Sequence, residues 1–345
     1  MRYGIIGSGS WATALAKILT DNKTPINWLM RSEEMVDHIR RRHHNPNYLR
    51  AVYFENSLLN LSTDINKIVD QSDIVLIAVP SAYLEETFAP LAKEAFHHKK
   101  IISAVKGMMP STNQLLNHYL ENEYGVELKD YVTIMGPCHA EEVAAEKLSY
   151  LTFSSIDHAL AQEVAKAFTT VYINTVVNTD VLGVQYAAIL KNIYALGAGI
   201  AHGLEYGDNF LSVLIANCAD EMANFLQKVG IPNMEVGKHH KEDEFTHRKD
   251  QNYAASVYLG DLLVTCYSLF SRNRTFGNMI GKGYSVRAAQ LEMNMVAEGY
   301  YGSKCIRAVN DQLNAEMPIA NAVYRILYEH VKPSRAFSEI ENVMI

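Results

Sequence analysis

The sequence has 345 residues, of which 48% are hydrophobic and 20% are charged, and its formal net charge is −7. This length and composition predict a folded chain of two domains and count against a disordered protein. The negative charge argues against a general attraction to nucleic acid or to an anionic membrane, so a phosphorylated ligand would need a local cationic pocket.

Cysteine usage and hydropathy predict the cellular compartment. The four cysteines are scattered and form no C-x-x-C pair, which is typical of reduced thiols: Cys138, Cys218, Cys266 and Cys305. No second ligand pair stands at zinc spacing, so we expect no metal site. A strand begins almost at residue 1, which leaves no room for a signal peptide, and no apolar run approaches the roughly 20 residues that cross a bilayer. We therefore expect a soluble, cytoplasmic protein with no membrane insertion.

Short apolar runs alternate with helical stretches through the first half of the chain. The runs predict strands at residues 3–6, 26–30, 74–79, 101–105 and 132–135, with two more at 150–153 and 172–177 that extend the same sheet. Apolar strands separated by helix-length segments are typical of a parallel sheet covered on both faces. We predict an α/β fold, with a doubly wound sheet as a first domain over residues 1–178.

Helical spacing dominates the second half of the chain. It predicts helices at residues 184–204, 211–228, 253–270, 285–295 and 318–329, and hence an all-helical second domain over residues 179–345. The segment 237–251 is strongly charged, so we expect a surface loop or lid there.

A glycine-rich turn follows the first predicted strand. Gly7, Gly9 and Ala12 form the G-x-G-x-x-A fingerprint of Rossmann dinucleotide-binding domains. Gly7 permits the tight turn, Gly9 lets a pyrophosphate approach the backbone, and Ala12 lets the helix pack closely on the strand. A purely structural strand–helix turn is the alternative, but the position at the start of an alternating β/α domain favours dinucleotide binding.

The residue after the second predicted strand bears on the choice of cofactor. An acidic residue there would bind the ribose 2′-hydroxyl of NAD, whereas Arg31 suits the 2′-phosphate of NADP. Arg31 as a solvated strand-end charge is the alternative, so the cofactor is NADP or NAD, with NADP favoured.

Later strands also end in groups suited to a ligand, because ligands of open parallel sheets lie beyond the carboxyl ends of the strands. Lys106 follows the strand at 101–105 and would direct a cation toward cofactor and substrate; a surface lysine is the alternative. Gly136 and Pro137 make a sharp turn whose backbone N–H groups suit an anion or a carbonyl oxygen. His139 is a possible acid or base, although a better candidate lies further on.

That candidate is a lysine within an almost wholly apolar helix. The stretch 184–204 is apolar around its circumference, which predicts burial, yet Lys191 and Asn192 lie near its centre. A buried ammonium group is costly unless a partner compensates, and this setting suits a general acid or base for an alcohol or ketone. A lysine that reaches the surface, or that merely pairs with a buried acid, is the alternative. We predict Lys191 as the catalytic residue and Asp261 as the carboxylate that orients it.

A polar cluster follows Asp261. Arg272 with Asn273 supplies a forked set of donors that fits a phosphate dianion. Alone, such a cluster is usually a solvated helix end. It indicates a phosphate site here only in combination with Lys106, Lys191 and Asp261.

These residues lie in motifs that resemble the bacterial NAD(P)-dependent glycerol-3-phosphate dehydrogenases over essentially the whole chain. The resemblance rests on seven motifs in order: GSGSWATALA (7–16), AVKG (104–107), GPCHAEE (136–142), GVQYAAILKN (183–192), GDLLVTC (260–266), SRNRTFG (271–277) and VAEG (296–299). It implies a cytoplasmic homodimer that interconverts sn-glycerol 3-phosphate and dihydroxyacetone phosphate and supplies phospholipid synthesis, with the helical domain serving substrate binding and dimerisation.

The resemblance also implies roles for individual residues, with Lys191 as the proton acceptor. The expected substrate-binding residues are Lys106, Gly136, Cys138, Lys191, Asn192, Asp261, Ser271, Arg272 and Asn273. The expected cofactor-binding residues are Gly7, Gly9, Ser10, Trp11, Arg31, Tyr48, Lys106, Ala140, Arg272, Val296 and Glu298.

Two departures and two rival interpretations accompany the resemblance. Position 138 is usually serine or threonine in the family, and residues 250–259 lack the expected glycine-rich approach, so the substrate lid could differ. One rival is another NAD(P)-dependent β-hydroxy-acid or nucleotide-sugar dehydrogenase. The other is a catalytically silent nucleotide sensor, which would need the glycine loop but not Lys106, Lys191 and Asp261 together.

Overall fold

The computed structural model describes residues 1–231, 254–293 and 297–344. The chain divides into two compact units, each taken by itself below. The first comprises Met1–Val105 and Leu115–Val181, and the second comprises Lys106–Gln114 and Leu182–Ile345. The short segment Lys106–Gln114, which the sequence places inside the first domain, therefore packs with the helical second unit.

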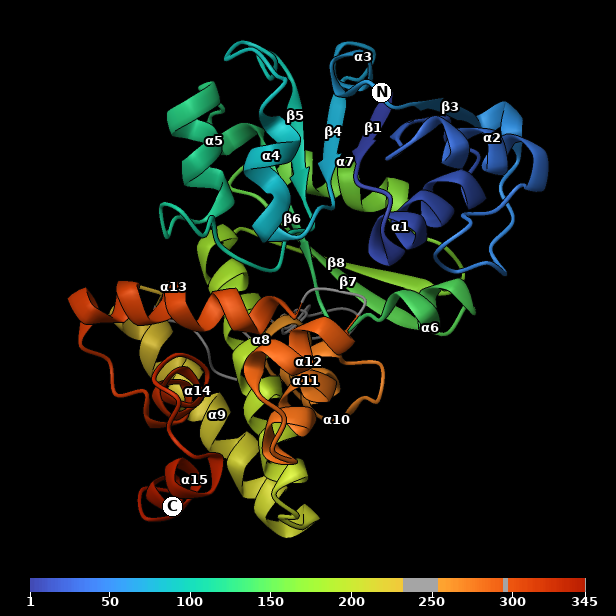
Figure 1. Ribbon diagram of the computed structural model, residues 1–345. Helices are drawn as coiled ribbons and strands as arrows, with labels where there is room; N and C mark the ends of the chain where they lie inside the picture. The colour runs from blue at the N-terminus through green and yellow to red at the C-terminus, as the bar shows by residue number, and fades with distance from the viewer. Residues whose placement is uncertain (232–253, 294–296, 345) are drawn as a thin grey trace, which may run out of the picture. The chain divides into compact units, whose positions relative to one another are not determined.

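The first unit is built on an eight-stranded sheet in the order β3-β2-β1-β4-β5-β6-β7-β8 (Figure 1). Its strands are β1 Tyr3–Ile6, β2 Ile26–Leu29, β3 Leu59–Ser62, β4 Ile74–Ile77, β5 Lys100–Ser103, β6 Tyr131–Met135, β7 Ser149–Ser154 and β8 Ile173–Asn178. The seven predicted strands are confirmed, and the predicted doubly wound α/β class holds. Sequence patterning missed β3, because the tetrapeptide LNLS is too short and polar to stand out.

The direction of the last two strands, β7 and β8, differs from the wholly parallel sheet that the sequence predicts. Strands β1 to β6 pair in parallel, but β7 runs antiparallel to β6 and then pairs in parallel with β8. A short connection that contains α6 returns the chain beside β6, and antiparallel neighbours need no long crossover. A strand that is buried on both faces is apolar throughout, whether it runs parallel or antiparallel to its neighbour, so the sequence does not reveal its direction.

Seven helices accompany this sheet: α1 Ser10–Asp21, α2 Glu33–Arg42, α3 Ile65–Asp70, α4 Leu84–Phe88, α5 Leu116–Tyr124, α6 Ala140–Ala144 and α7 His158–Phe168. Helices α1 and α3 contact β1 and β2, and α7 contacts β7 and β8. Local sequence explains α2 well. The hydroxyl of Ser32 caps its first turn, Glu33 and Glu34 follow, and three arginines fill its last turn, all of which complement the helix dipole.

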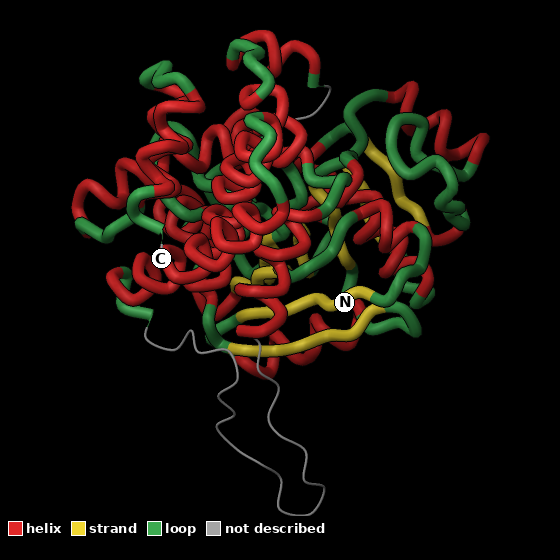
Figure 2. The backbone as a smooth tube through the Cα atoms, turned by 90° about the horizontal axis from the view of Figure 1, so that it is seen from below, coloured by secondary structure: helices red, strands yellow, loops and turns green. Residues whose placement is uncertain are grey.

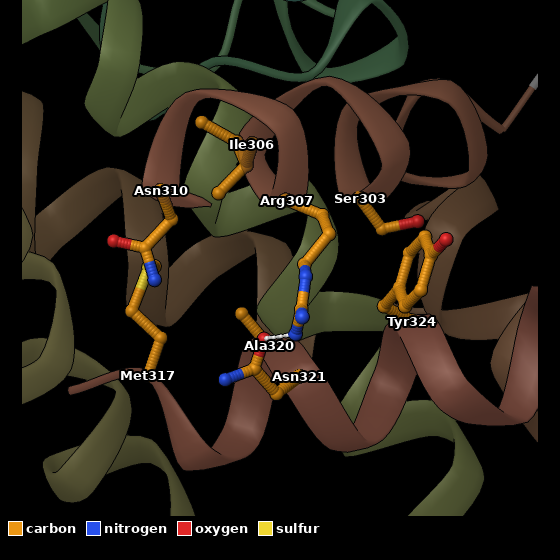
Figure 3. Close-up of a pocket in the computed structure, with 8 residues that line it drawn as sticks. All are labelled: Ser303, Ile306, Arg307, Asn310, Met317, Ala320, Asn321 and Tyr324. Carbon is orange, nitrogen blue, oxygen red and sulfur yellow. Dashed lines mark hydrogen bonds between the residues drawn. The ribbon is translucent and has the colours of Figure 1, made fainter. Parts of the chain in front are cut away.

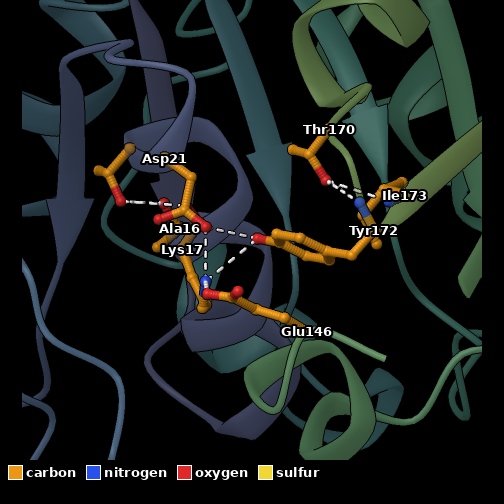
Figure 4. Close-up of polar contacts among 8 residues, drawn as sticks. Ala16, Lys17, Asp21, Glu146, Thr170, Tyr172 and Ile173 are labelled. Atoms are coloured by element: carbon orange, nitrogen blue, oxygen red, sulfur yellow. Dashed lines mark hydrogen bonds and ion pairs between the residues drawn. The ribbon is translucent and has the colours of Figure 1, made fainter. Parts of the chain in front are cut away.

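Helix α1 is also held by a partly buried ion-pair cluster around Lys17 (Figure 4). The ammonium group of Lys17 lies 2.5 Å from Asp21, 2.9 Å from Glu146 and 3.2 Å from the hydroxyl of Tyr172. Burial acts to lower the pKa of Lys17, but the hydrogen bonds to these three partners outweigh it and raise that pKa. The cluster joins α1 to the ends of α6 and β8, which restrains the helix that follows the glycine loop.

The described elements of the second unit are helices; Figure 2 draws the helices of both units in red. Its elements are α8 Val181–Gly203, α9 Asp208–Lys228, the π-helical segment η4 Ala254–Gly260, α10 Asp261–Tyr267, α11 Arg272–Gly281, α12 Val286–Glu292, α13 Glu298–Leu313, α14 Pro318–Tyr328 and α15 Pro333–Glu341. The all-helical prediction is confirmed, although α11, α13 and α15 were not foreseen and the stretch 253–270 divides into η4 and α10. The predicted loop or lid at 237–251 lies outside the described residues.

Helix α8 is long and apolar enough to cross a membrane, so the expectation that no apolar run approaches that length is wrong. Its 23 residues are the single such case in the described part of the chain, and 94% of its most apolar window is buried inside the protein. Burial of this kind is typical of a central core helix. The other helices of the unit supply the apolar surroundings that a bilayer would otherwise supply.

Paired glycines let α8 and α11 touch backbone to backbone. A Cβ on Gly277 would lie 2.1 Å from the carbonyl oxygen of Leu196, and one on Gly199 would lie 2.1 Å from that of Arg274. Real side chains never approach this closely, so both positions require glycine. A third glycine, Gly299 at the start of α13, meets the carbonyl oxygen of Asn192 in the same way, at 2.4 Å. These contacts gather the first turns of α11 and α13 around the middle of α8.

Candidate active site

The glycine loop has the geometry of a phosphate-binding turn. Gly7 has a φ of +127°, and a Cβ there would lie 2.5 Å from the carbonyl oxygen of Ala78, so the turn requires glycine. At Gly9, by contrast, a Cβ would meet no described atom within 4 Å. Helix α1 begins at Ser10 with no acidic residue in its first turn. Its N-terminal N–H groups and the open space beside Gly9 fit a pyrophosphate.

Four further residues of the expected cofactor set belong to the same unit. Ser10 is buried in the first turn of α1, and Trp11 beside it is half-buried. Arg31 follows β2, is exposed, and forms no ion pair with residues 1–231, 254–293 or 297–344. Tyr48 is half-buried and lies in the segment after α2. This half-buried or exposed placement leaves Trp11, Arg31 and Tyr48 with accessible surface for a ligand.

The turn after β6 is tightly built. Gly136 has a φ of +126°, and a Cβ there would lie 2.6 Å from the carbonyl oxygen of Tyr150 on β7. The thiol of Cys138 donates to that same carbonyl over 3.0 Å. Ala140 is buried as the first residue of α6, and His139 precedes it as the helix N-cap residue. The side chain at position 138 therefore holds β7, a contact that the sequence did not predict.

In the second unit, Lys191 and Asp261 form an ion pair between α8 and the first residue of α10. Their side chains are 4% and 2% exposed, so water screens the pair very little. The prediction that Asp261 pairs with Lys191 is confirmed. Of the two alternatives, a lysine that reaches the surface is wrong, whereas a lysine paired with a buried acid is what the structure shows.

A chain of amide hydrogen bonds begins at Asn192, the residue after Lys191 on α8. The side chain of Asn192 donates to the carbonyl oxygen of Lys106 over 3.1 Å, and it accepts from the side chain of Asn273 over 2.9 Å. Asn273 in turn accepts from the backbone N–H of Gly299 over 2.9 Å. The sequence pointed to Asn192 and Asn273 as ligand contacts. In this structure they also join the segment after β5 to α8, α11 and α13, a role that only the tertiary contacts reveal.

The N-terminus of α11 presents positive charge. The hydroxyl of Ser271 accepts from the backbone N–H of Arg274 over 3.3 Å and so caps the helix. Arg272 is the first helical residue and is exposed, while Asn273 after it is buried. An exposed guanidinium at the positive end of a helix dipole suits a dianion. Glu298 begins α13, and Val296 lies outside the described residues.

A shallow hollow between α13 and α14 contains none of these residues and has no room for a water molecule (Figure 3). Arg307 crosses it, donating to Asn321 over 3.1 Å and pairing with Asp311 at 3.1 Å. Its charge is therefore already compensated within the protein. We assign no ligand to this hollow.

A doubly wound sheet with a glycine loop at its first helix, together with a helical unit that buries a lysine–aspartate pair, is the architecture of the nucleotide-dependent dehydrogenases that carry a helical second domain. The family models are more specific. Residues 3–173 match the N-terminal model of NAD-dependent glycerol-3-phosphate dehydrogenase, and residues 180–338 match the C-terminal model. The chain belongs to this family.

Similar proteins extend the match over nearly the whole chain. A glycerol-3-phosphate dehydrogenase [NAD(P)+] of Streptococcus sanguinis is 32% identical over 342 residues, which cover 99% of this chain and 95% of that relative. One of Bacillus anthracis is 33% identical over 325 residues, or 94% and 90% of the two chains. The crystal structure of glycerol-3-phosphate dehydrogenase from Coxiella burnetii has a TM-score of 0.84 at 27% identity and covers 98% of both chains.

Proposed function

We propose that the protein catalyses the NAD(P)-dependent interconversion of sn-glycerol 3-phosphate and dihydroxyacetone phosphate. The observation that carries the proposal is the buried ion pair of Lys191 and Asp261. A chain that had kept only the fold would gain no advantage from two buried charges, since apolar residues of similar volume would be at least as stabilising. Family membership supplies the substrate.

The first unit binds the dinucleotide in this proposal. The N–H groups at the start of α1 and the open space at Gly9 take the pyrophosphate, while Arg31 pairs with a 2′-phosphate when NADP is the cofactor. Ser10, Trp11, Tyr48 and Ala140 complete the contacts in this unit. The nicotinamide, when bound, supplies the acceptor or donor of hydride.

The second unit binds the substrate and moves the proton. Arg272, at the positive end of α11, holds the phosphate together with Ser271 and Asn273. In the oxidation direction Lys191 acts as the neutral amine, which accepts the proton of the C2 hydroxyl and becomes the ammonium group; in the reduction direction the ammonium group gives that proton to the C2 oxygen. Asp261 fixes the position of the Lys191 side chain, because its carboxylate is bonded to the ammonium group and is itself held in the first turn of α10. Lys106 contributes a second cation.

The rival dehydrogenase classes are less well supported. A β-hydroxy-acid or nucleotide-sugar substrate would need a carboxylate or nucleotide site, whereas both halves of this chain match the family of NAD-dependent glycerol-3-phosphate dehydrogenases. A silent nucleotide sensor has no use for the buried Lys191–Asp261 pair. We also propose that the protein is a cytoplasmic homodimer, dimerising through its helical domain, and that its product feeds phospholipid synthesis.

Side-by-side oxidation rates of NADPH and NADH test the function directly. With dihydroxyacetone phosphate we expect turnover with at least one of the two cofactors, faster with NADPH because of Arg31. With 2-keto acids at the same concentration we expect none. Turnover with a 2-keto acid but not with dihydroxyacetone phosphate would replace the proposal with the hydroxy-acid alternative.

A further inference from the structure

Three consecutive carbonyl groups of the glycine loop are each bonded by a buried side chain. The indole N–H of Trp28 donates to Gly7 over 2.7 Å, the amide of Asn45 donates to Ser8 over 3.1 Å, and the hydroxyl of Thr13 donates to Gly9 over 2.9 Å. All three side chains are fully buried. Since their carbonyls face the protein, the peptide groups of the loop are fixed in orientation before any ligand arrives.

The Asn45 amide makes three further hydrogen bonds. Its nitrogen also donates to the hydroxyl of Thr13 over 2.9 Å, and its oxygen accepts from the backbone N–H groups of Asn47, over 3.0 Å, and of Tyr48, over 3.3 Å. The amide thus uses both of its hydrogens and both oxygen lone pairs. Because a carbonyl oxygen lies on one side and N–H groups lie on the other, only one orientation of the amide is possible. Asn45 therefore bonds the glycine loop to the segment that carries Tyr48.

We propose that Asn45 is a positioning residue of the dinucleotide site, which sets the glycine loop and Tyr48 in a fixed relation so that both contact the same cofactor. The proposal rests on the proposed function, since it assumes that this loop and Tyr48 bind NAD(P). Asn45 acts through the backbone and does not touch the cofactor. Aspartate cannot replace it, because a carboxylate of the same shape lacks donors and would face the carbonyl oxygen of Ser8.

The test compares two buried asparagines of the same unit. Asn45→Asp removes the bonds to the loop. Asn27→Asp on β2 makes the same chemical change where the amide instead donates to Gln71, over 3.0 Å, and to Ser72, over 2.9 Å, away from the glycine loop. For each variant we would measure the Kd of NADPH by fluorescence titration, the KM of dihydroxyacetone phosphate at saturating NADPH, and Tm.

We expect Asn45→Asp to raise the Kd of NADPH by about tenfold or more, as the loss of buried hydrogen bonds implies, with the KM of dihydroxyacetone phosphate within about twofold. Asn27→Asp should lower Tm comparably but leave that Kd within about twofold. An unchanged Kd in Asn45→Asp, or equal increases in both variants, overturns the proposal. If Asn45→Asp does not fold, Thr13→Val, which removes the Asn45–Thr13–Gly9 chain, decides by the same Kd criterion.

The same measurements separate this inference from the proposed function. A wild-type protein that binds NADPH but does not reduce dihydroxyacetone phosphate refutes the reaction, while the role of Asn45 still stands or falls by the Kd values. A wild-type protein that binds neither NADPH nor NADH refutes both.

Discussion

The ammonium group of Lys191 bonds one carboxylate oxygen of Asp261, while the second oxygen, Oδ2, is buried without a hydrogen-bond partner in the described part of the chain. Buried carboxylates normally satisfy both oxygens, because an unpaired one loses its hydration without compensation. Asp261 therefore has one carboxylate oxygen, next to Lys191, that can still accept a hydrogen bond. A substrate hydroxyl or an ordered water molecule would satisfy it.

Removal of the pair should abolish turnover without unfolding the protein. Lys191→Met alone leaves Asp261 as an uncompensated buried charge, which costs about 3–5 kcal/mol. The double variant Lys191→Met/Asp261→Leu removes both charges and should fold with a Tm near that of the wild type. We expect its kcat to fall by about 10²–10⁴-fold, which is the usual contribution of a general acid or base.

Titration of NADPH into the same double variant supplies the control. Its Kd should match that of the wild type, because the glycine loop belongs to the other unit. A double variant that folds and keeps a kcat within about tenfold of the wild-type value would remove Lys191 from the mechanism.

Arg31 should set the preference between the two cofactors. It is exposed and forms no ion pair among the described residues, so its guanidinium is available to a 2′-phosphate. Arg31→Ala should raise the KM of NADPH by about 10- to 100-fold, the usual effect of losing a charged hydrogen bond, and leave that of NADH unchanged. Arg42→Ala, an exposed arginine in the last turn of α2, is the matched control. Equal effects of Arg31→Ala on both cofactors would contradict the assignment.

Sequence reasoning reached the features that depend on local pattern and failed where distant contacts decide. The glycine fingerprint, the apolar strands and the lysine on an apolar helix are visible within short windows of sequence. Asn45 was invisible, because its role comes from the approach of two segments and its own residue type is common in loops. The direction of β7 escaped for the same reason, since a strand buried on both faces carries no sign of its orientation.

The backbone contact between α8 and α11 should tolerate no side chain. In Gly277→Ala the new methyl group would lie 2.1 Å from the carbonyl oxygen of Leu196, so the two helices must separate. We expect a loss of at least about 1–3 kcal/mol in unfolding free energy and a raised KM for dihydroxyacetone phosphate, because Arg272 and Asn273 move with α11. Urea unfolding and steady-state kinetics measure the two effects.

Gly207→Ala serves as the comparison for that variant. Gly207 is the N-cap residue of α9, and a Cβ there would meet no described atom within 4 Å. The unfolding free energy of Gly207→Ala should stay within about 0.5 kcal/mol of the wild-type value. Any change should be a small decrease, because alanine is a poorer N-cap than glycine. If both variants are equally stable, the close contact is not what holds α11 in place.

A buried carboxylate in the second unit should make the stability of the protein depend on pH. Glu221 on α9 is 5% exposed and accepts from the backbone N–H groups of Ile319, over 2.7 Å, and Ala320, over 2.9 Å, in the first turn of α14. Burial raises the pKa of Glu221 from 4.5 to about 7, even though these two hydrogen bonds act to lower it. The folded protein therefore holds a proton that the unfolded chain releases above about pH 4.5.

A group whose pKa is raised by folding stabilises the native state below its unfolded pKa, and the contribution disappears as the pH rises through the folded value. For Glu221 this predicts a loss of about 2.5 kcal/mol in unfolding free energy between pH 5 and pH 8. Glu221→Gln keeps the shape and one acceptor but cannot titrate. The unfolding free energy of the variant, relative to that of the wild type, should therefore rise by about the same amount between pH 5 and pH 8. Urea unfolding followed by the helical circular dichroism signal at each pH measures the difference. A constant difference between the two proteins from pH 5 to pH 8 would show that Glu221 carries the same charge in the folded and unfolded chain.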